Sequence, residues 1–193
     1  MAQPIQTLTK RPLRAIYPLM DIYHIITLPD PVLRQVAQPV NRVDDAVRAQ
    51  MAKMAETMYE AEGVGLAANQ VGMLNRVIVI DTSRRETEIR NPIVMANPEI
   101  VWKSEELWTC KEGCLSIPQM YADVERPRVI RVRFLDAQGE TQEIEVSNLG
   151  SSCVQHEIDH LDGKLFIDHI SRLKRTNLLK KYDKLLKEAG DAL

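Results

Sequence analysis

The chain has few cysteines, no long hydrophobic run and almost no net charge. Three cysteines in 193 residues are an odd number and too few for a disulfide framework, so they favour a reducing compartment and at least one thiol with a chemical role. No stretch approaches the roughly 18–20 apolar residues of a membrane-spanning helix, so we expect no membrane partner. A formal net charge of −2 gives no overall reason to expect DNA binding.

Size and composition are those of an ordinary soluble globular protein. The length fits one domain, or two small ones, and the chain is 45% hydrophobic and 27% charged. Residues 1–20 contain no acidic residue and three basic ones, a faint likeness to an organellar transit peptide, but they have no serine and no apolar core for a signal peptide. We therefore expect residues 1–20 to be a disordered N-terminal extension.

The first predicted helix covers residues 43–61, where apolar residues recur at helical spacing. Asn41 or Asp44 can cap its start, and Gly63 lies just past its end. The apolar side consists of Val47, Met51, Met54 and Met58. Such a stripe indicates core packing rather than a functional surface.

Short strands are predicted in the middle of the chain. Residues 76–81 form an apolar run, and residues 128–135 and 141–146 alternate apolar and polar around a turn at 136–139, which indicates an antiparallel hairpin. A final helix is predicted over residues 171–188. The order of helix, antiparallel strands and helices indicates an α+β fold.

The strongest chemical signal is the run His-Glu-Ile-Asp-His over residues 156–160. In a helix the two histidines lie one turn apart on the same face, where they can bind one metal ion beside Glu157 as a general base. We predict that this helix begins near Ser151 or Ser152 and ends at Gly163. Because a catalytic metal needs a third protein ligand, that ligand decides the chemistry.

Metalloproteases with this motif take the third ligand from downstream, and this chain offers no good one. Phe166 occupies the position at which the metzincin pattern places a third histidine. The only downstream glutamate is Glu188, which we expect to be a solvated charge on a lysine-rich helix. His169 remains as an option, although a surface or capping role suits it better.

The cysteines offer an upstream alternative. Cys153 lies on the same helix, but it is seven residues from His160, roughly 10 Å along the axis, so we expect it to be a small core residue. Cys114 follows the flexible Gly113 in a strand-loop region, and sulfur is a good ligand for Zn²⁺ or Fe²⁺. We therefore predict that Cys114, His156 and His160 bind the metal and leave a fourth position open.

Residues 63–72 form a small-residue segment that lets another backbone approach closely. The segment lacks the Gly-Lys-Ser/Thr ending of a phosphate loop. Gln70 within it is a neutral donor without an obvious structural task, although an isolated amide is more often a surface or capping residue.

Three segments together resemble the peptide deformylase family. Its motif Gly-x-Gly-Leu-Ala-Ala-x-Gln stands at residues 63–70, Glu-Gly-Cys-Leu-Ser at 112–116, and Gln-His-Glu-x-Asp-His-Leu-x-Gly at 155–163. The motifs occur in family order with suitable spacing, and the similarity extends over about residues 25–170. Three ordered motifs make the resemblance specific.

The resemblance implies an activity and a cofactor. Members of the family hydrolyse the N-formyl group from the initiator methionine of new chains and release formate. Cys114, His156 and His160 would bind one divalent ion, Fe²⁺ in most members with Zn²⁺ or Ni²⁺ as substitutes. Glu157 would be the general acid/base. The partners would be N-formylmethionyl nascent peptides, and the location would be the bacterial cytoplasm rather than an organelle.

The resemblance also implies roles around the substrate. Gln70 and the backbone N–H of Leu115 would stabilise the oxyanion, and Val64 and Gly65 would suit a peptide that docks edge-on as an added strand. Some relatives carry a basic residue seven positions after the metal cysteine, where this chain has Tyr121. That departure concerns contacts beyond the first substrate residues.

The family's fold agrees with the pattern of elements: α+β, with antiparallel strands packed around a central helix that carries the third motif, and with an N-terminal and a C-terminal helix. We predict a catalytic domain over residues 21–170 and a basic amphipathic C-terminal helix over 171–193. A solvated face is the default interpretation of such charges. In some members this helix docks on the ribosome, and a basic face would suit ribosomal RNA.

Two rival functions and one regulatory hypothesis accompany this prediction. A metalloprotease is disfavoured by Phe166 and by an upstream cysteine ligand. A metal-binding or interaction protein without activity is disfavoured by the retention of Glu157 and Gln70. Cys110 lies outside the motifs, and we hypothesise that oxidation pairs it with Cys114 and empties the metal site.

Overall fold

The fold is α+β, as predicted. The computed structural model describes residues 22–83 and 90–190, so the expected extension over residues 1–20 lies outside the described residues. The helices are α1 (Asp45–Glu60), α3 (Asn148–Leu161) and α4 (Arg172–Gly190), with 3-10 turns η2 (Pro31–Arg34), η3 (Ala68–Val71) and η4 (Phe166–Asp168). The strands are β1 (Gly65–Ala67), β2 (Val77–Ile80), β3 (Ile93–Lys103), β4 (Leu107–Cys114), β5 (Ile117–Pro127), β6 (Val129–Leu135) and β7 (Thr141–Ser147).

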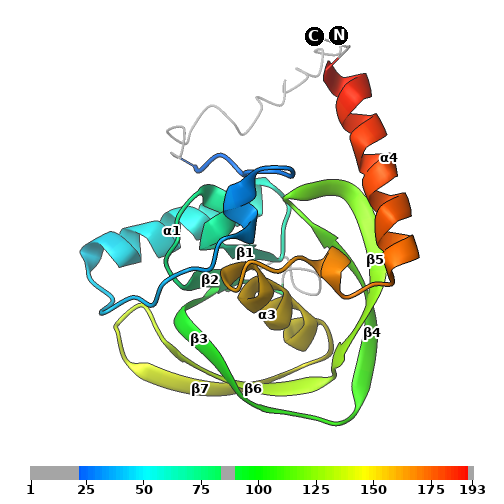
Figure 1. Cartoon of the computed structure of the whole chain (residues 1–193). Helices are drawn as coiled ribbons and strands as arrows, with labels where there is room; N and C mark the ends of the chain where they lie inside the picture. The colour runs from blue at the N-terminus through cyan, green and yellow to red at the C-terminus, as the bar shows by residue number, and fades with distance from the viewer. Residues whose placement is uncertain (1–21, 84–89, 191–193) are drawn as a thin grey trace, which may run out of the picture.

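The strands form two antiparallel sheets. One has five strands in the order β1-β2-β3-β6-β7, and the other is the hairpin β4-β5. Figure 1 shows α3 at the centre of the molecule with strands on several sides. The predicted arrangement of antiparallel strands around a central helix is confirmed, and so is the predicted hairpin, which is β6-β7.

Strand β2 shows how two helices share one sheet. All four of its side chains are buried. Val77 and Val79 pack in the apolar cluster that contains α1, whereas Ile78 and Ile80 pack in the cluster that contains α3. Because successive side chains of a strand point to opposite faces, α1 and α3 cover opposite faces of the sheet. The continuous apolar run of β2 follows from burial on both sides.

Helix α1 has both a side-chain cap and a regular end. Asp44 is the N-cap, and its carboxylate accepts a hydrogen bond from the backbone N–H of Val47. At the other end Glu62, rather than Gly63, takes the left-handed conformation, with φ of 56°. The N–H of Gly63 then donates to the carbonyl of Met58, which completes a Schellman motif. The predicted methionine stripe is buried.

Helix α3 begins earlier than the predicted start near Ser151 or Ser152. Its first residue is Asn148, directly after β7, and both serines are buried inside it. Ser151 donates its hydroxyl hydrogen bond to the carbonyl of Pro127, so it ties the helix to β5 instead of capping it. The predicted stop is close, because α3 ends at Leu161 and is followed by Gly163 with φ of 71°.

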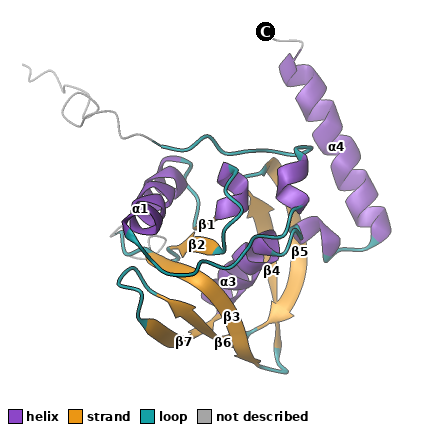
Figure 2. Cartoon of the chain, turned by 60° about the vertical axis from the view of Figure 1, so that its left-hand side comes forward, coloured by secondary structure: helices purple, strands orange, loops and turns teal. Residues whose placement is uncertain are grey.

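Helix α4 packs on a third apolar cluster beside β5. Tyr182 is fully buried there, and its hydroxyl donates to the carbonyl of Leu28. Figure 2 shows α4 extending past the rest of the molecule from its attachment near β5. The helix spans nearly the range predicted from the sequence, and the expected solvated glutamate, Glu188, lies 3.6 Å from Lys184 on its outside.

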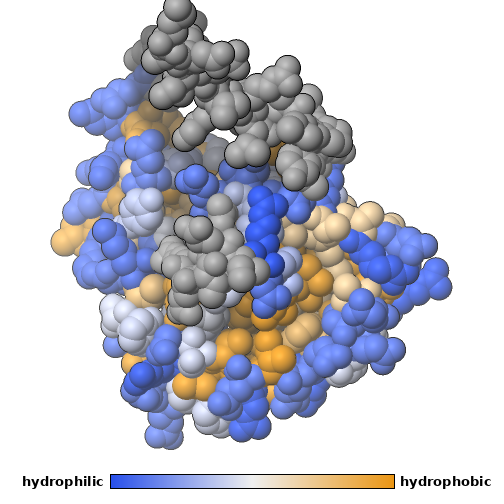
Figure 3. Space-filling view, turned by 180° about the vertical axis from the view of Figure 1, so that it is seen from behind, coloured by the Kyte–Doolittle hydropathy of each residue, from blue (hydrophilic) through white to orange (hydrophobic). Residues whose placement is uncertain are grey.

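Hydrophobic and hydrophilic residues are unevenly distributed over the back of the molecule (Figure 3). Seen from behind, hydrophobic residues gather towards the centre of the face and hydrophilic residues surround them (Figure 3). Among the helices of the described ranges, none has the length and apolar character needed to cross a membrane.

Candidate metal centre

The central helix places the two motif histidines together. His156 and His160 lie one turn apart on α3, both are buried, and their ring centroids are 5.0 Å apart in an edge-to-face arrangement. Phe166, which stands where a metzincin would have its third histidine, stacks on His156 at a centroid distance of 6.2 Å. That position therefore packs against a ligand instead of supplying one.

Cys114 completes the group from the end of β4. Its Sγ lies 3.2 Å from Nε2 of His160, and the ligand atoms of Cys114, His156 and His160 all lie within 4.8 Å of one another. A register shift between Gly113 and Cys114 ends the regular pairing with β5 at this point. These three residues form a metal site, and it is the one such group found within residues 22–83 and 90–190.

The orientation of His156 fits a metal ligand. Its Nδ1 lies 2.9 Å from Oε2 of Glu112, so the other ring nitrogen is left for an ion. A carboxylate that holds the far nitrogen of a ligating histidine fixes the ring and raises its basicity. The donor set of one thiolate and two imidazoles suits Zn²⁺ or Fe²⁺ and leaves room for a further ligand.

Glu112, which contacts His156, belongs to a buried ion-pair network. Arg126 donates to Glu112 through Nε at 2.5 Å and Nη2 at 3.0 Å, and to Asp159 through Nη1 at 2.7 Å. Burial opposes ionisation of Glu112, but the hydrogen bonds from His156 and Arg126 hold its pKa below the usual value. His169, the weak alternative ligand, instead contacts Asp159 at 2.7 Å. The network joins β4, β5 and α3.

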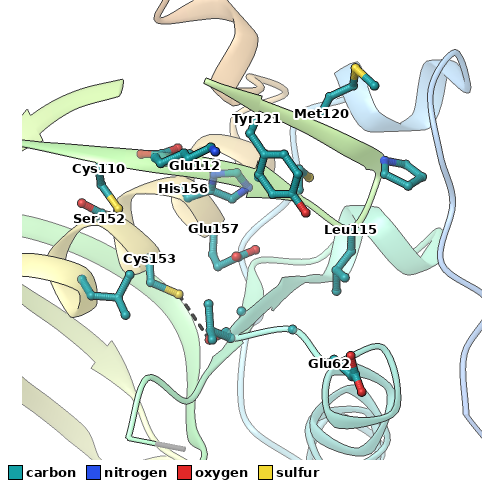
Figure 4. A pocket seen from close by; sticks show the side chains of 18 of the residues that line it. Glu62, Cys110, Glu112, Leu115, Met120, Tyr121, Ser152, Cys153, His156 and Glu157 are labelled. Atoms are coloured by element: carbon teal, nitrogen blue, oxygen red, sulfur yellow. Dashed lines mark hydrogen bonds and ion pairs between the residues drawn. The ribbon is translucent and has the colours of Figure 1, made fainter. Parts of the chain in front are cut away.

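Glu157 lies on the open side of the metal site. Its side chain points into a cavity of about 370 Å³ (Figure 4). Only 4% of the residue is exposed, and its Oε2 has no hydrogen-bond partner among the described residues. Burial raises the pKa of Glu157 to about 7, because desolvation disfavours the charged carboxylate. Such a group can exchange a proton near neutral pH.

Val64 and Gly65 line the same cavity at the sheet's edge. Among the described strands β1 pairs only with β2, so its other side is unpaired in this sheet. A Cβ added to Gly65 would lie 2.3 Å from Oε1 of Glu157 and 2.9 Å from Sγ of Cys153. Glycine at position 65 is what allows the carboxylate to lie against the strand.

Gln70 and Leu115 both line the cavity, and Gln70 contacts the two residues that flank Leu115. The amide oxygen of Gln70 accepts from the N–H of Ala67 at 2.9 Å, and its nitrogen donates to the hydroxyl of Ser116 at 3.1 Å. The same nitrogen lies 3.5 Å from Sγ of Cys114. These contacts hold the amide in one orientation beside the metal site.

The other two cysteines also line the cavity. Cys153 is buried, as expected, and its Sγ donates to the carbonyl of Val64 at 3.3 Å. Cys110 and Cys114 both belong to β4, so four extended steps place their Cα atoms roughly 13 Å apart. A disulfide needs Cα atoms within about 7 Å. The hypothesised Cys110–Cys114 pairing is therefore incompatible with this fold.

Comparison with known proteins agrees with this geometry. The family model of polypeptide deformylases matches residues 22–176. The chain belongs to the peptide deformylase family. The enzyme is 53% identical over 169 residues to the peptide deformylase of Bartonella quintana, covering 88% of this chain and 96% of the relative, and 55% identical over 170 residues to that of Methylocella silvestris, covering 87% of each.

Solved deformylase structures share the fold. The Legionella pneumophila enzyme superposes with a TM-score of 0.81 at 41% identity, over 88% of this chain and 98% of that one. The Ehrlichia chaffeensis enzyme gives 0.82 at 35% identity, over 90% and 100%. This enzyme is accordingly a metal-dependent hydrolase that removes the N-formyl group from the N-terminal methionine of new proteins, as predicted.

Sequence reasoning missed three residues of the network behind His156. Glu112 and Asp159 lie inside the second and third motifs but were given no role, and Arg126 lies outside all three. The signal that could have found the two acids is their place beside ligands, since ligating histidines usually contact a carboxylate. No comparable signal marks Arg126, because charged residues on a hairpin are usually solvated.

Proposed function

We propose that Glu157 is the general acid/base of the deformylation reaction and that Gln70 and the N–H of Leu115 stabilise the developing oxyanion. The observation that carries the proposal is the unpaired, buried carboxylate oxygen of Glu157 in the cavity beside the metal site. In a protein interior, such a buried polar atom is unusual unless a ligand or a reaction uses it.

Cys114, His156 and His160 would hold the metal, which supplies Lewis acidity and activates water when it is bound. Glu157 accepts a proton as water adds to the formyl carbon, and it then delivers that proton to the leaving nitrogen. The carbon–nitrogen bond breaks, and formate and a free amine leave. A pKa of about 7 for Glu157 allows both transfers near neutral pH.

The formyl oxygen gains negative charge as the water adds. The side-chain amide of Gln70 is held by its contacts with Ser116 and with the N–H of Ala67. Its nitrogen and the Leu115 N–H would both donate to the formyl oxygen. A preorganised donor of this kind contributes about 3 kcal/mol to the transition state. Because the amide is already oriented, little reorganisation is needed during the reaction.

The peptide would dock along Val64 and Gly65 as a strand added to the edge of the sheet. Strand β1 offers an unpaired edge beside the cavity, and main-chain hydrogen bonds along such an edge tolerate many side chains. An enzyme that acts on the beginnings of many different proteins needs this tolerance. A peptide docked in this way would have its formyl group near Glu157, because Gly65 adjoins that carboxylate.

The proposal is tested by formate release from formyl-Met-Ala-Ser. We expect the purified enzyme to release formate from this peptide and to leave the unformylated peptide intact. Cleavage of internal bonds in both peptides would support the metalloprotease alternative instead. Absence of formate release from protein with a full complement of metal would support the inactive alternative.

We further propose Fe²⁺ as the physiological metal, with Zn²⁺ or Ni²⁺ as substitutes. One thiolate and two imidazoles suit each of these ions, so the donor set supports the proposal. Metal analysis of anaerobically purified protein, paired with the formate assay, decides between them. Activity that follows zinc content and not iron content would contradict the choice of Fe²⁺.

We also propose that the enzyme is cytoplasmic. We propose a catalytic domain over residues 21–170 followed by an appended helix over 171–193. This helix would dock on the ribosome. The outer side of α4 carries several exposed basic residues, which suit ribosomal RNA. We expect Lys184→Glu with Lys187→Glu to weaken co-sedimentation with ribosomes. Unchanged co-sedimentation would contradict docking through α4.

A further inference from the structure

A second cavity adjoins the first, between β5 and α4. Its volume is about 570 Å³, and we call it the β5–α4 groove. It is adjacent to the cavity that contains Glu157, because the two share four lining residues: Lys111, Gln119, Met120 and Tyr121. Helix α4 supplies Lys174, Asn177, Leu178 and Lys181 to its wall. Figure 1 shows α4 beside β5.

The charges of the groove are mostly positive and unpaired. It is lined by three lysines, Lys111, Lys174 and Lys181, and by one aspartate, Asp123. None of these four side chains forms an ion pair within the described part of the chain. Lys111 instead places its Nζ 5.4 Å from the centre of the Tyr121 ring, and Tyr121 is 60% exposed. The groove is therefore suited to an acidic ligand.

The basic residues of α4 fall into two groups. Lys174, Asn177 and Lys181 follow one another at spacings of three and four, so they lie on one face of the helix, and they line the groove. Arg172 and Lys180 are exposed and do not line it. The positive charge of the groove is therefore separable from the general charge of α4.

The distance from the metal site to the β5–α4 groove equals the length of a few extended peptide residues. Ile117 pairs with Cys114 in the β4–β5 register, and Asp123 in the groove lies six residues further along β5. At about 3.3 Å per residue this is roughly 20 Å. An extended peptide whose first residue is at the metal site, and which continues beside β5 after leaving β1, would place about its fifth to seventh residues near Tyr121 to Asp123 in the groove.

We propose that the β5–α4 groove binds acidic side chains of the nascent peptide about five to seven residues after its formyl-methionine. The inference rests on the proposed function, since it takes the peptide to begin at the metal site. The groove thus makes the enzyme favour substrates with early acidic residues. Tyr121 lies where the peptide would pass from the first cavity to the second.

The test compares formylated decapeptides that differ only at positions five to seven. One carries Asp-Glu-Asp there and the other Asn-Gln-Asn, and each rate is normalised to formyl-Met-Ala-Ser. We expect the acidic peptide to show about three- to tenfold higher kcat/KM through a lower KM, with kcat similar. Because exposed charges are screened by salt, we expect this preference to shrink between 20 mM and 500 mM salt.

Two double variants with equal loss of charge locate the effect. Lys174→Gln with Lys181→Gln should remove most of the preference, whereas Arg172→Gln with Lys180→Gln should keep it.

Equal kcat/KM for both decapeptides in the unmodified enzyme would overturn the proposal, and so would an equal loss in both variants. Loss of ribosome co-sedimentation in the groove variant, with the peptide preference intact, would assign the groove to RNA and also overturn it. Failure on formyl-Met-Ala-Ser itself would count against the proposed function instead.

Discussion

Glu112 and Glu157 are the same kind of residue, both buried beside His156, and they differ in what surrounds them. Glu112 accepts hydrogen bonds from Arg126 and contacts His156, and its pKa is held low. One oxygen of Glu157 has no hydrogen-bond partner within the described ranges, and burial raises the pKa of Glu157 to about 7. The difference shows how hydrogen-bond partners set the behaviour of a buried carboxylate. A paired carboxylate stays ionised and holds its neighbours in place, whereas an unpaired one has a raised pKa that suits proton transfer.

The largest effect should follow from the unpaired carboxylate. We expect Glu157→Gln to lower formate release about 10³-fold, because a positioned general acid/base contributes 10²- to 10⁴-fold. Metal content and folding should stay near those of the unmodified enzyme. The exposed Glu143→Gln on β7 is the control. A loss of less than tenfold at full metal content would remove Glu157 from its proposed role.

The paired carboxylate should instead affect stability and metal. Glu112→Gln leaves Arg126 buried without one of its partners, so we expect the free energy of unfolding to fall by about 3 kcal/mol and metal affinity to fall about 10- to 100-fold. The exposed pair of Arg128 and Glu106, which flanks the open end of the same hairpin, provides a control. Denaturant titration of Glu106→Gln should show a change below about 1 kcal/mol, and equal effects at both sites would break the contrast.

The geometry around Glu157 can be disturbed without touching its charge. A methyl group at position 65 would collide with the carboxylate, so we expect Gly65→Ala to lower kcat about 10²-fold by displacing it. Gly150→Ala is a matched change on α3, where an added Cβ meets its nearest neighbour at 3.7 Å. That variant should retain activity. Normal kcat for Gly65→Ala would show that the position of Glu157 tolerates movement.

A third carboxylate, Asp168, gives the smallest and pH-dependent effect. Burial opposes its ionisation, but Arg34, the Leu165 N–H and Arg175 hold its pKa below the usual value. Its charge therefore stabilises the fold above the ordinary pKa near 4, and this contribution is lost as pH falls through the depressed value. Because Asp168 is partly exposed, we expect Asp168→Asn to cost only about 1 kcal/mol at pH 7. Chemical denaturation at pH 7 and pH 3 should show this cost and then a smaller one, because the contribution declines as pH falls from the ordinary pKa towards the depressed one. A cost independent of pH would contradict the electrostatic origin.

The spacing of apolar residues predicted the helices and strands whose buried positions recur at regular helical or strand intervals. The methionine stripe predicted α1, and the alternation over residues 128–146 predicted the β6–β7 hairpin. Strands β4 and β5 were not delimited, because β4 is largely exposed and its residues show little alternation. The predicted start of α3 was too late because Ser151, a residue type typical of helix caps, instead donates to Pro127 on β5 from inside the helix.

The ligands of the metal site were predictable because motif spacing on a helix fixes two of them, and the third needed only an unexplained thiol. The partners of those ligands were harder to predict. The contact between Arg126 and Glu112 depends on the register of β4 against β5, which sets Glu112 opposite Ala122. A pairing across a hairpin cannot be read from residue types alone, because one step of register would place the charges on different faces.

Strand β1 also explains how an unpaired sheet edge avoids self-association. The opposite edge strand, β7, is seven residues long and carries Glu143 and Glu145, charges that discourage pairing with another chain. Strand β1 has no charged residue, but it has only three residues, and all of them are buried. One chain end can reach so short and recessed an edge, whereas a second sheet cannot. The proposed peptide docking would therefore use an edge that does not invite aggregation.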